Sequence, residues 1–183
     1  HSPHRRGTQH HTHRGRQEVP HRYAPVLRVQ RRVRASGEDR MKKIAKWIKS
    51  WEWPDEVTDE VEKLLEPGQT LNICAGANRL GDVKIDLDPK NAKVQQGDMR
   101  DLQFEDETFD NTIIDPPWKL GYYQRFRPFY EAVRVTKVGG RIIYNATWIP
   151  HSDQCELEAV FVRRDGHWGN VSVFSIFRRL TNE

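Results

Sequence analysis

The sequence contains little cysteine and no long apolar run. Its two cysteines, Cys74 and Cys155, show none of the CxxC spacing of structural zinc sites. Two isolated thiols are typical of a reducing compartment, so we expect a cytoplasmic protein without a metal site. No apolar run approaches the roughly 18 residues that would span a membrane, and no secretory signal is recognisable. We therefore expect no membrane partner.

Lysine and acidic residues are scarce in the first 40 residues. Residues 1–40 hold ten Arg, no Lys, six of the eight His and three acids, whereas residues 41–183 hold 20 basic and 23 acidic residues. The basic charge therefore belongs to this tail and gives no evidence that the rest binds a polyanion. The tail lacks hydrophobic periodicity, so we expect a disordered or non-native extension before a domain at 41–183. An Arg-rich arm for nucleic acid and a histidine metal site are the alternatives for the tail.

Hydrophobic periodicity predicts alternating helices and strands after residue 41. Apolar residues spaced three and four apart predict helices over 42–51, 55–66 and 127–136. The first of these, rich in Lys and Trp, would cover one face of a sheet or, alternatively, contact nucleic acid. Apolar runs predict strands over 71–74, 83–87, 93–96, 109–114, 141–144, 157–162 and 171–177. This order predicts a three-layer α/β domain with one antiparallel edge strand.

Residues suited to ligand binding follow the first predicted strands. The first strand ends in small residues that let the backbone approach a ligand, and in an Asn able to take a left-handed conformation. The second ends in carboxylates that can accept hydrogen bonds from ribose hydroxyls, and the third in a carboxylate that can accept one from an adenine amine. These residues are Ala75, Gly76, Asn78, Asp86, Asp88 and Asp98. Ligands bind beyond the carboxyl ends of parallel strands, so we expect one shared cleft.

Residues 68–180 resemble the class I S-adenosylmethionine-dependent methyltransferases. Residues 97–110 (GDMRDLQFEDETFD) are similar to that family's GDxxxLPFxDxSFD stretch, and 131–140 (EAVRVTKVGG) to its EAxRVLKPGG helix and turn. The resemblance implies a Rossmann-like, mostly parallel seven-stranded sheet with a C-terminal antiparallel hairpin. It also implies S-adenosylmethionine as cofactor, with Asp86 at the ribose and Asp98 and Met99 beside the adenine. The implied cofactor-binding residues are Asn72, Cys74, Ala75, Gly76, Asn78, Asp86, Asp88, Asp98, Met99 and Asp115.

The sequence Asp115-Pro116-Pro117-Trp118 resembles the (D/N/S)PP(Y/F/W) motif of amino methyltransferases. Those enzymes act on adenine N6, cytosine N4, guanine N2 in RNA or a glutamine side chain, and the Trp form is most associated with adenine N6. We predict these four residues to be catalytic. The Asp115 carboxylate and Pro116 carbonyl can accept the two N–H bonds of an amine whose lone pair is delocalised into the ring, while the prolines hold the backbone rigid. Trp118 offers a face for stacking the base.

The residues after this motif include both basic and aromatic side chains. We predict that Trp118, Lys119, Tyr122, Tyr123 and Arg125 bind substrate, gripping a phosphate backbone and a flipped base. An ordinary capping loop is the alternative.

The sequence therefore predicts methyl transfer to an exocyclic amine of a nucleobase in DNA or RNA, most of all adenine N6. A partner chain or a homo-oligomer would supply target recognition, because little sequence is left for it. One alternative is a methyltransferase acting on a small molecule or a protein glutamine. Another is a catalytically silent methyltransferase-like partner subunit, suggested by Asn72 and Asn78, which stand where the family usually has an acid and often has a glycine.

Overall fold

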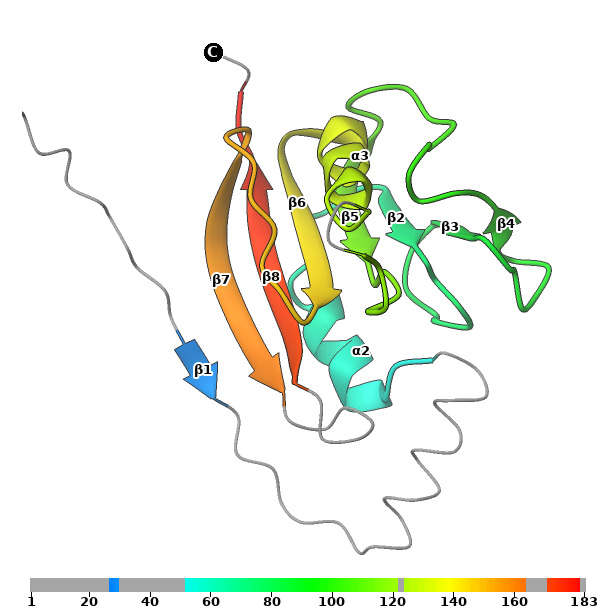
Figure 1. Cartoon of the computed structure of the whole chain (residues 1–183), viewed down its shortest axis with the longest axis horizontal. Coiled ribbons are helices and arrows are strands. Elements are labelled where there is room, and N and C mark those ends of the chain that lie inside the picture. Colours follow the sequence, from blue (N-terminus) through cyan, green and yellow to red (C-terminus); the bar gives the residue numbers. More distant parts are fainter. Residues whose placement is uncertain (1–26, 30–51, 122–123, 164–170, 182–183) are drawn as a thin grey trace, which may run out of the picture.

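The computed structural model describes residues 27–29, 52–121, 124–163 and 171–181 (Figure 1). Its sheet has eight strands in the order β1-β7-β8-β6-β5-β2-β3-β4. The strands are β1 (Leu27–Val29), β2 (Thr70–Ile73), β3 (Val83–Asp86), β4 (Gln95–Gln96), β5 (Phe109–Ile114), β6 (Thr136–Ala146), β7 (Cys155–Arg163) and β8 (Ser172–Arg179). Helices α2 (Asp55–Glu62) and α3 (Arg127–Val135) pack against this sheet. The described helices are too short and too polar to cross a membrane.

Strands β2 to β8 form the predicted seven-stranded sheet. Neighbouring strands from β4 to β6 pair in parallel, whereas β8 pairs antiparallel with both β6 and β7. This confirms the Rossmann-like, mostly parallel sheet with a C-terminal antiparallel hairpin. The expectation that the antiparallel strand lies at the edge is wrong, because β8 lies between β6 and β7. Most of β8 is buried and much of β7 is partly exposed, which agrees with the inner position of β8.

The two helices cover opposite faces of the sheet. Phe129 and Ala132 of α3 are buried in the cluster that contains Ile114 of β5. Val57 of α2 is buried in a second cluster, which contains the adjacent residue Ile113. Because successive side chains of a strand point to opposite faces, the two clusters lie on either side of the sheet. The expected three layers are confirmed.

The helices differ from the sequence prediction mainly at their ends. Helix α2 covers the first two turns of the helix predicted over 55–66, and the segment that follows it is a turn. The helix predicted over 42–51 lies outside the described residues. Turns and bends connect β2 to β3, β3 to β4 and β4 to β5, so this half of the sheet is joined by short connections.

Strand β1 brings three residues of the Arg-rich tail to the edge of the sheet. Its residues pair in parallel with Val160, Phe161 and Val162 of β7. The tail was predicted to take no part in the fold, and at these three residues the structure differs. An open sheet edge presents unpaired backbone N–H and C=O groups, which the backbone of a short extended segment such as Leu27–Val29 can satisfy.

The glycine pair before the fifth predicted strand lies inside β6. The sequence predicts that residues 138–140 end a helix and that a strand begins at 141, but β6 begins directly after α3 at Thr136. The register with β5 shifts here, because Thr136 pairs with Phe109 and Arg141 with Asn111. The two glycines therefore form a bulge. Gly139 has a φ of +78°, and a Cβ on Gly140 would lie 2.7 Å from the carbonyl oxygen of Asp110.

We expect Gly140→Ala to destabilise the protein more than Gly139→Ala. A methyl group on Gly140 would overlap two backbone carbonyls, and such overpacking costs about 1–3 kcal/mol. A methyl group on Gly139 meets nothing within 4 Å, so its cost is the left-handed backbone alone, about 1–2 kcal/mol. Urea unfolding of the two variants measures both costs. A larger loss in Gly139→Ala would show that the bulge is not packed as described.

Candidate functional site

The carboxyl ends of β2, β3 and β5 lie side by side at one edge of the sheet. Strand β2 pairs in parallel with both of the others. The loops that follow are joined by backbone hydrogen bonds. The Ala75 N–H donates to the Ile85 carbonyl (3.0 Å), and the Asp115 N–H donates to the Ile73 carbonyl (3.3 Å). Residues that are distant in the sequence are thereby brought to one edge, as the parallel arrangement predicts.

The thiol of Cys74 is buried at this edge. Burial raises the pKa of Cys74 well above its usual value, and the negative charges of Asp86, Asp115 and Asp98 raise it further. The carboxylates predicted to bind cofactor and substrate therefore act electrostatically on the loop after β2.

The loop after β2 is held in an unusual conformation. Cys74 has a φ of +58° and Gly76 a φ of +52°. A positive φ is uncommon for a residue other than glycine and persists only where the surroundings impose it. The Asp86 carboxylate contributes to this, because it accepts hydrogen bonds from the N–H groups of Gly76 and Asp88, each at 3.0 Å. Asp86 thus ties the loop after β2 to the end of β3.

Asn72 and Asn78, both predicted to bind cofactor, lie inside the protein. They are 2% and 5% exposed. The Asn72 side chain donates to the Leu80 carbonyl (3.0 Å), and the Asn78 side chain accepts from the Leu80 N–H (3.0 Å). Both amides therefore hold the loop before β3, and neither is placed to contact a cofactor. The left-handed conformation expected at Asn78 occurs at Cys74 instead.

Asp88 and Asp98 differ in their surroundings. The Asp88 side chain is 81% exposed and pairs with Lys90, so it is directed away from the other carboxylates. The Asp98 carboxylate pairs with the Arg100 guanidinium, with 2.6 Å between Oδ2 and the nearest nitrogen. This hydrogen bond lowers the pKa of Asp98. Its neighbour Met99 lies against Cys74, with 3.4 Å between the two sulfur atoms. Asp98 and Met99 therefore belong to the site, and Asp88 lies at its margin.

Asp115 follows β5 and is held by neutral hydrogen-bond donors. The Trp53 indole N–H donates to Oδ2 (2.7 Å) and the Asn145 amide to Oδ1 (3.0 Å). Burial raises the pKa of Asp115 to about 6, although hydrogen bonds from Trp53, Asn145 and Trp118 lower it. The residue as a whole is partly exposed, whereas its carboxyl group is buried. A carboxyl group with a raised pKa at converging strand ends marks a functional site.

The sequence prediction did not include Trp53, Asn145 or Ser172. The Ser172 hydroxyl donates to the Asn145 side-chain oxygen (2.6 Å) and so fixes the orientation of that amide. Asn145 lies near the carboxyl end of β6, so the same strand-end rule could have found it. Trp53 precedes its partner by 62 residues, and no local signal points to this contact.

The predicted substrate residues are only partly defined. Pro116 is buried and Pro117 exposed, Trp118 is half-buried and Lys119 is exposed. Tyr122 and Tyr123 lie outside the described residues.

Arg125 lies near two aromatic rings. Its guanidinium carbon lies 5.2 Å from the ring centre of Trp148 and 5.3 Å from that of Phe126. The Arg125 carbonyl accepts a hydrogen bond from the hydroxyl of Tyr144 (3.3 Å). Burial raises the pKa of Tyr144, the charges of Cys74 and Asp115 raise it further, and Arg125 lowers it. Arg125 therefore lies close to the same edge of the sheet as Asp115.

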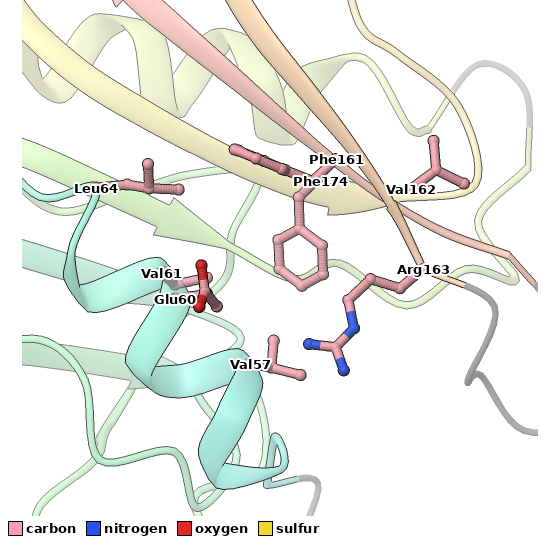
Figure 2. A pocket seen from close by; sticks show the side chains of 8 residues that line it. All are labelled: Val57, Glu60, Val61, Leu64, Phe161, Val162, Arg163 and Phe174. Atoms are coloured by element: carbon pink, nitrogen blue, oxygen red, sulfur yellow. The ribbon is translucent and has the colours of Figure 1, made fainter. Parts of the chain in front are cut away.

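A separate apolar groove lies between α2 and the β7–β8 pair (Figure 2). Its walls include Val57 and Val61 of α2 and Phe161 and Phe174 of the strands. None of the catalytic, cofactor-binding or substrate-binding residues predicted from the sequence lines this groove. Within the described ranges no three metal-ligating side chains come together, here or elsewhere. The strand-end cluster is therefore the candidate site.

Comparison with known proteins identifies the fold. No protein-family model matches the sequence, and no curated protein matches it. The chain is similar to a protein from Pyrococcus horikoshii (TM-score 0.50, 18% identity, 79% of this chain and 92% of that one). It is similar to a methyltransferase candidate from Bacillus halodurans (TM-score 0.50, 14% identity, 68% and 99%) and to the [4+2]-cyclase SpnF (TM-score 0.52, 13% identity, 70% and 81%).

These similarities show that the chain has the fold of class I S-adenosylmethionine-dependent methyltransferases. That part of the sequence resemblance is confirmed. At such low identities the likeness establishes the fold alone, and one of the similar structures is a cyclase. The activity must therefore be argued from the site.

Proposed function

We propose that this chain is an S-adenosylmethionine-dependent methyltransferase acting on an exocyclic amine of a nucleobase in DNA or RNA, foremost adenine N6. The observation that carries the proposal is the position of Asp115. Its largely buried carboxyl group precedes Pro116-Pro117-Trp118 and lies at the same sheet edge as Cys74 and Asp86. An acceptor for an amine and a loop for a cofactor thus lie together.

The residues at this edge fit S-adenosylmethionine. Asp86 would accept hydrogen bonds from a ribose, Asp98 and Met99 would lie beside the adenine, and Gly76 would bring the backbone close. Among the described residues Asp98 pairs with Arg100, but Asp86 and Asp115 form no ion pair. Negative charge that is not neutralised by the protein favours a positively charged ligand. The bound cofactor would supply an electrophilic methyl group on a positively charged sulfur.

The chain's own residues would prepare the amine for attack. Ionised Asp115 accepts one N–H bond of the amine and the Pro116 carbonyl accepts the other. Accepting both bonds favours a pyramidal nitrogen, whose lone pair is then withdrawn from the ring. The two prolines fix φ and keep this carbonyl in place. No strong base is needed before transfer, because the proton leaves afterwards, and alignment provides much of the acceleration.

A nucleic acid is the substrate that best matches the residues around Asp115. Trp118 offers a ring on which the target base can stack, a contact of about 1–3 kcal/mol. Lys119 and Arg125 provide positive charge for phosphates, and Arg125 is already held by the rings of Trp148 and Phe126. Tyr122 and Tyr123 belong to the same proposed substrate segment. We further propose a cytoplasmic protein in which a partner chain or a second copy supplies target recognition.

Mass spectrometry of nucleosides tests the proposal. The protein is incubated with S-adenosylmethionine and with DNA or RNA, and the digested polymer is analysed for methylated bases. We expect N6-methyladenine in one of the two polymers and none with Asp115→Ala. No methylated base in either polymer would overturn the proposal. Radiolabel transfer to protein or small-molecule pools in the same experiment would favour a glutamine or small-molecule methyltransferase.

One observation favours a second function, a catalytically silent partner subunit. Both Asp115 oxygens already accept hydrogen bonds within the protein, and Asp98 is engaged by Arg100. Calorimetry with S-adenosylmethionine separates the two functions. Heat of binding and a raised melting temperature support the enzyme, whereas neither effect would support the silent subunit.

A further inference from the structure

We infer that Trp53, Asn145 and Ser172 are positioning residues that hold the Asp115 carboxylate in one orientation for accepting the substrate amine. The inference rests on the proposed function. Trp53 donates to one carboxylate oxygen at 2.7 Å and Asn145 to the other at 3.0 Å. Ser172 donates to the Asn145 oxygen at 2.6 Å, which directs the amide nitrogen toward Asp115.

These donors are fixed by packing on three different elements. Trp53, just before α2, is 5% exposed, and its ring lies edge-on against Phe174 of β8 with 5.3 Å between ring centres. Asn145 on β6 is 4% exposed and Ser172 on β8 is 8% exposed. Strands β6 and β8 are antiparallel neighbours, and Asn145 pairs in register with Phe174. Neither the indole nor the amide can turn away without breaking core contacts, so the carboxylate plane is set by the fold.

The donors restrict the carboxylate without neutralising it. An ionised carboxylate has about four acceptor positions, so the donors Trp53, Asn145 and Trp118 still leave one position for an amine N–H. A buried acid with only a structural role is normally paired with a cation. Asp115 forms no ion pair among the described residues, and its partners are neutral. The negative charge therefore stays available to a substrate.

The titratable groups that face Asp115 stay neutral around it. Cys74 at the end of β2 and Tyr144 on β6 both have raised pKa values, chiefly because they are buried. The charges of Asp86 and Asp98 also raise the pKa of Cys74, and the charge of Arg125 lowers that of Tyr144. Burial raises the pKa of Asp115 to about 6, and its donors lower it. Protonated Asp115 cannot accept an amine N–H with that oxygen, so we expect the rate to fall below about pH 6.

Trp53→Phe tests the inference, because it removes the indole N–H and keeps an aromatic ring against Phe174. Loss of a hydrogen bond to a charged group should lower kcat about 10- to 100-fold. Because the hydrogen bond from Trp53 lowers the pKa of Asp115, that pKa should rise when the bond is removed. The acidic limb of the plot of kcat against pH should therefore move to higher pH. The KM for S-adenosylmethionine should stay unchanged. Ser172→Ala should move the limb in the same direction by less.

Phe174→Leu is the matched control for packing. It loosens the contact under Trp53 but leaves the indole N–H, so we expect a lower melting temperature with the acidic limb in place. An active wild-type protein whose limb does not move in Trp53→Phe would overturn the inference and leave the proposed function standing. A wild-type protein that methylates no substrate would overturn the proposed function, and the inference with it.

Discussion

Asp115→Ala is expected to lower the rate of methyl transfer about 1,000-fold, while binding of S-adenosylmethionine is retained. The carboxylate is the acceptor that withdraws the amine lone pair from the ring, and preorganised polar groups of this kind contribute about 10²–10³-fold each. Misalignment of the amine adds to the loss. Single-turnover transfer of a radiolabelled methyl group measures the rate, and calorimetry measures cofactor binding.

Asp115→Asn separates the lost chemistry from a damaged core. Alanine leaves the Trp53 N–H and the Asn145 amide without their acceptor, and each unsatisfied buried group costs about 1–3 kcal/mol. Asparagine fills the same volume and keeps one oxygen, but its NH₂ group replaces the second acceptor. We therefore expect Asp115→Asn to be more stable than alanine and to keep more of the transfer, because its amide oxygen can still accept one N–H of the amine. Transfer within threefold of the wild type in Asp115→Ala would remove Asp115 from the catalytic site.

Asp86→Ala is expected to weaken binding of S-adenosylmethionine about 100-fold or more. The Asp86 carboxylate anchors the loop after β2 by accepting from Gly76, and it is the proposed acceptor for the ribose. Each hydrogen bond to a charged group is worth about 1.5–3 kcal/mol, and about 1.4 kcal/mol is a factor of ten in affinity. Calorimetric titration measures the change.

Asp88→Ala is the matched control, because this carboxylate is two residues away and exposed. Its side chain pairs with Lys90, and it meets Asp86 through its backbone N–H, which alanine keeps. We expect its affinity to change less than about threefold, as for exposed ion pairs worth about 0–1 kcal/mol. Equal losses in the two variants would show that Asp86 does not bind the ribose.

The sheet could be predicted because its signals are local. The prediction of β5 over 109–114 agrees with its bounds, although only Phe109, Ile113 and Ile114 are apolar and the polar residues Asn111 and Thr112 are also buried. The mostly parallel sheet with a C-terminal antiparallel hairpin followed from the resemblance. The bulge at Gly139 and Gly140 was missed, because a turn and a bulge both use glycine with positive φ.

Only those residues of the site that lie at the ends of predicted strands could be predicted from the sequence. Asp86, Asp98 and Asp115 were found because each lies at or just after the end of a predicted strand. The role of Asn72 could not be predicted, because it depends on a contact with Leu80. The Asn72 amide donates a hydrogen bond to the Leu80 carbonyl, and an ionised acid at this position has no hydrogen to donate. The contact between Trp53 and Asp115 joins residues 62 positions apart, and it exists only once the segment around α2 has packed on the sheet.

The central claim is that the ends of β2, β3 and β5 hold a methyl donor beside Asp115. Titration of the ¹⁵N-labelled protein with S-adenosylhomocysteine, followed by NMR, tests it most directly. The largest amide shifts should occur at Gly76, Asp88, Met99 and Asp115. No shift at saturating ligand, or shifts confined to the groove between α2 and β7, would contradict the claim.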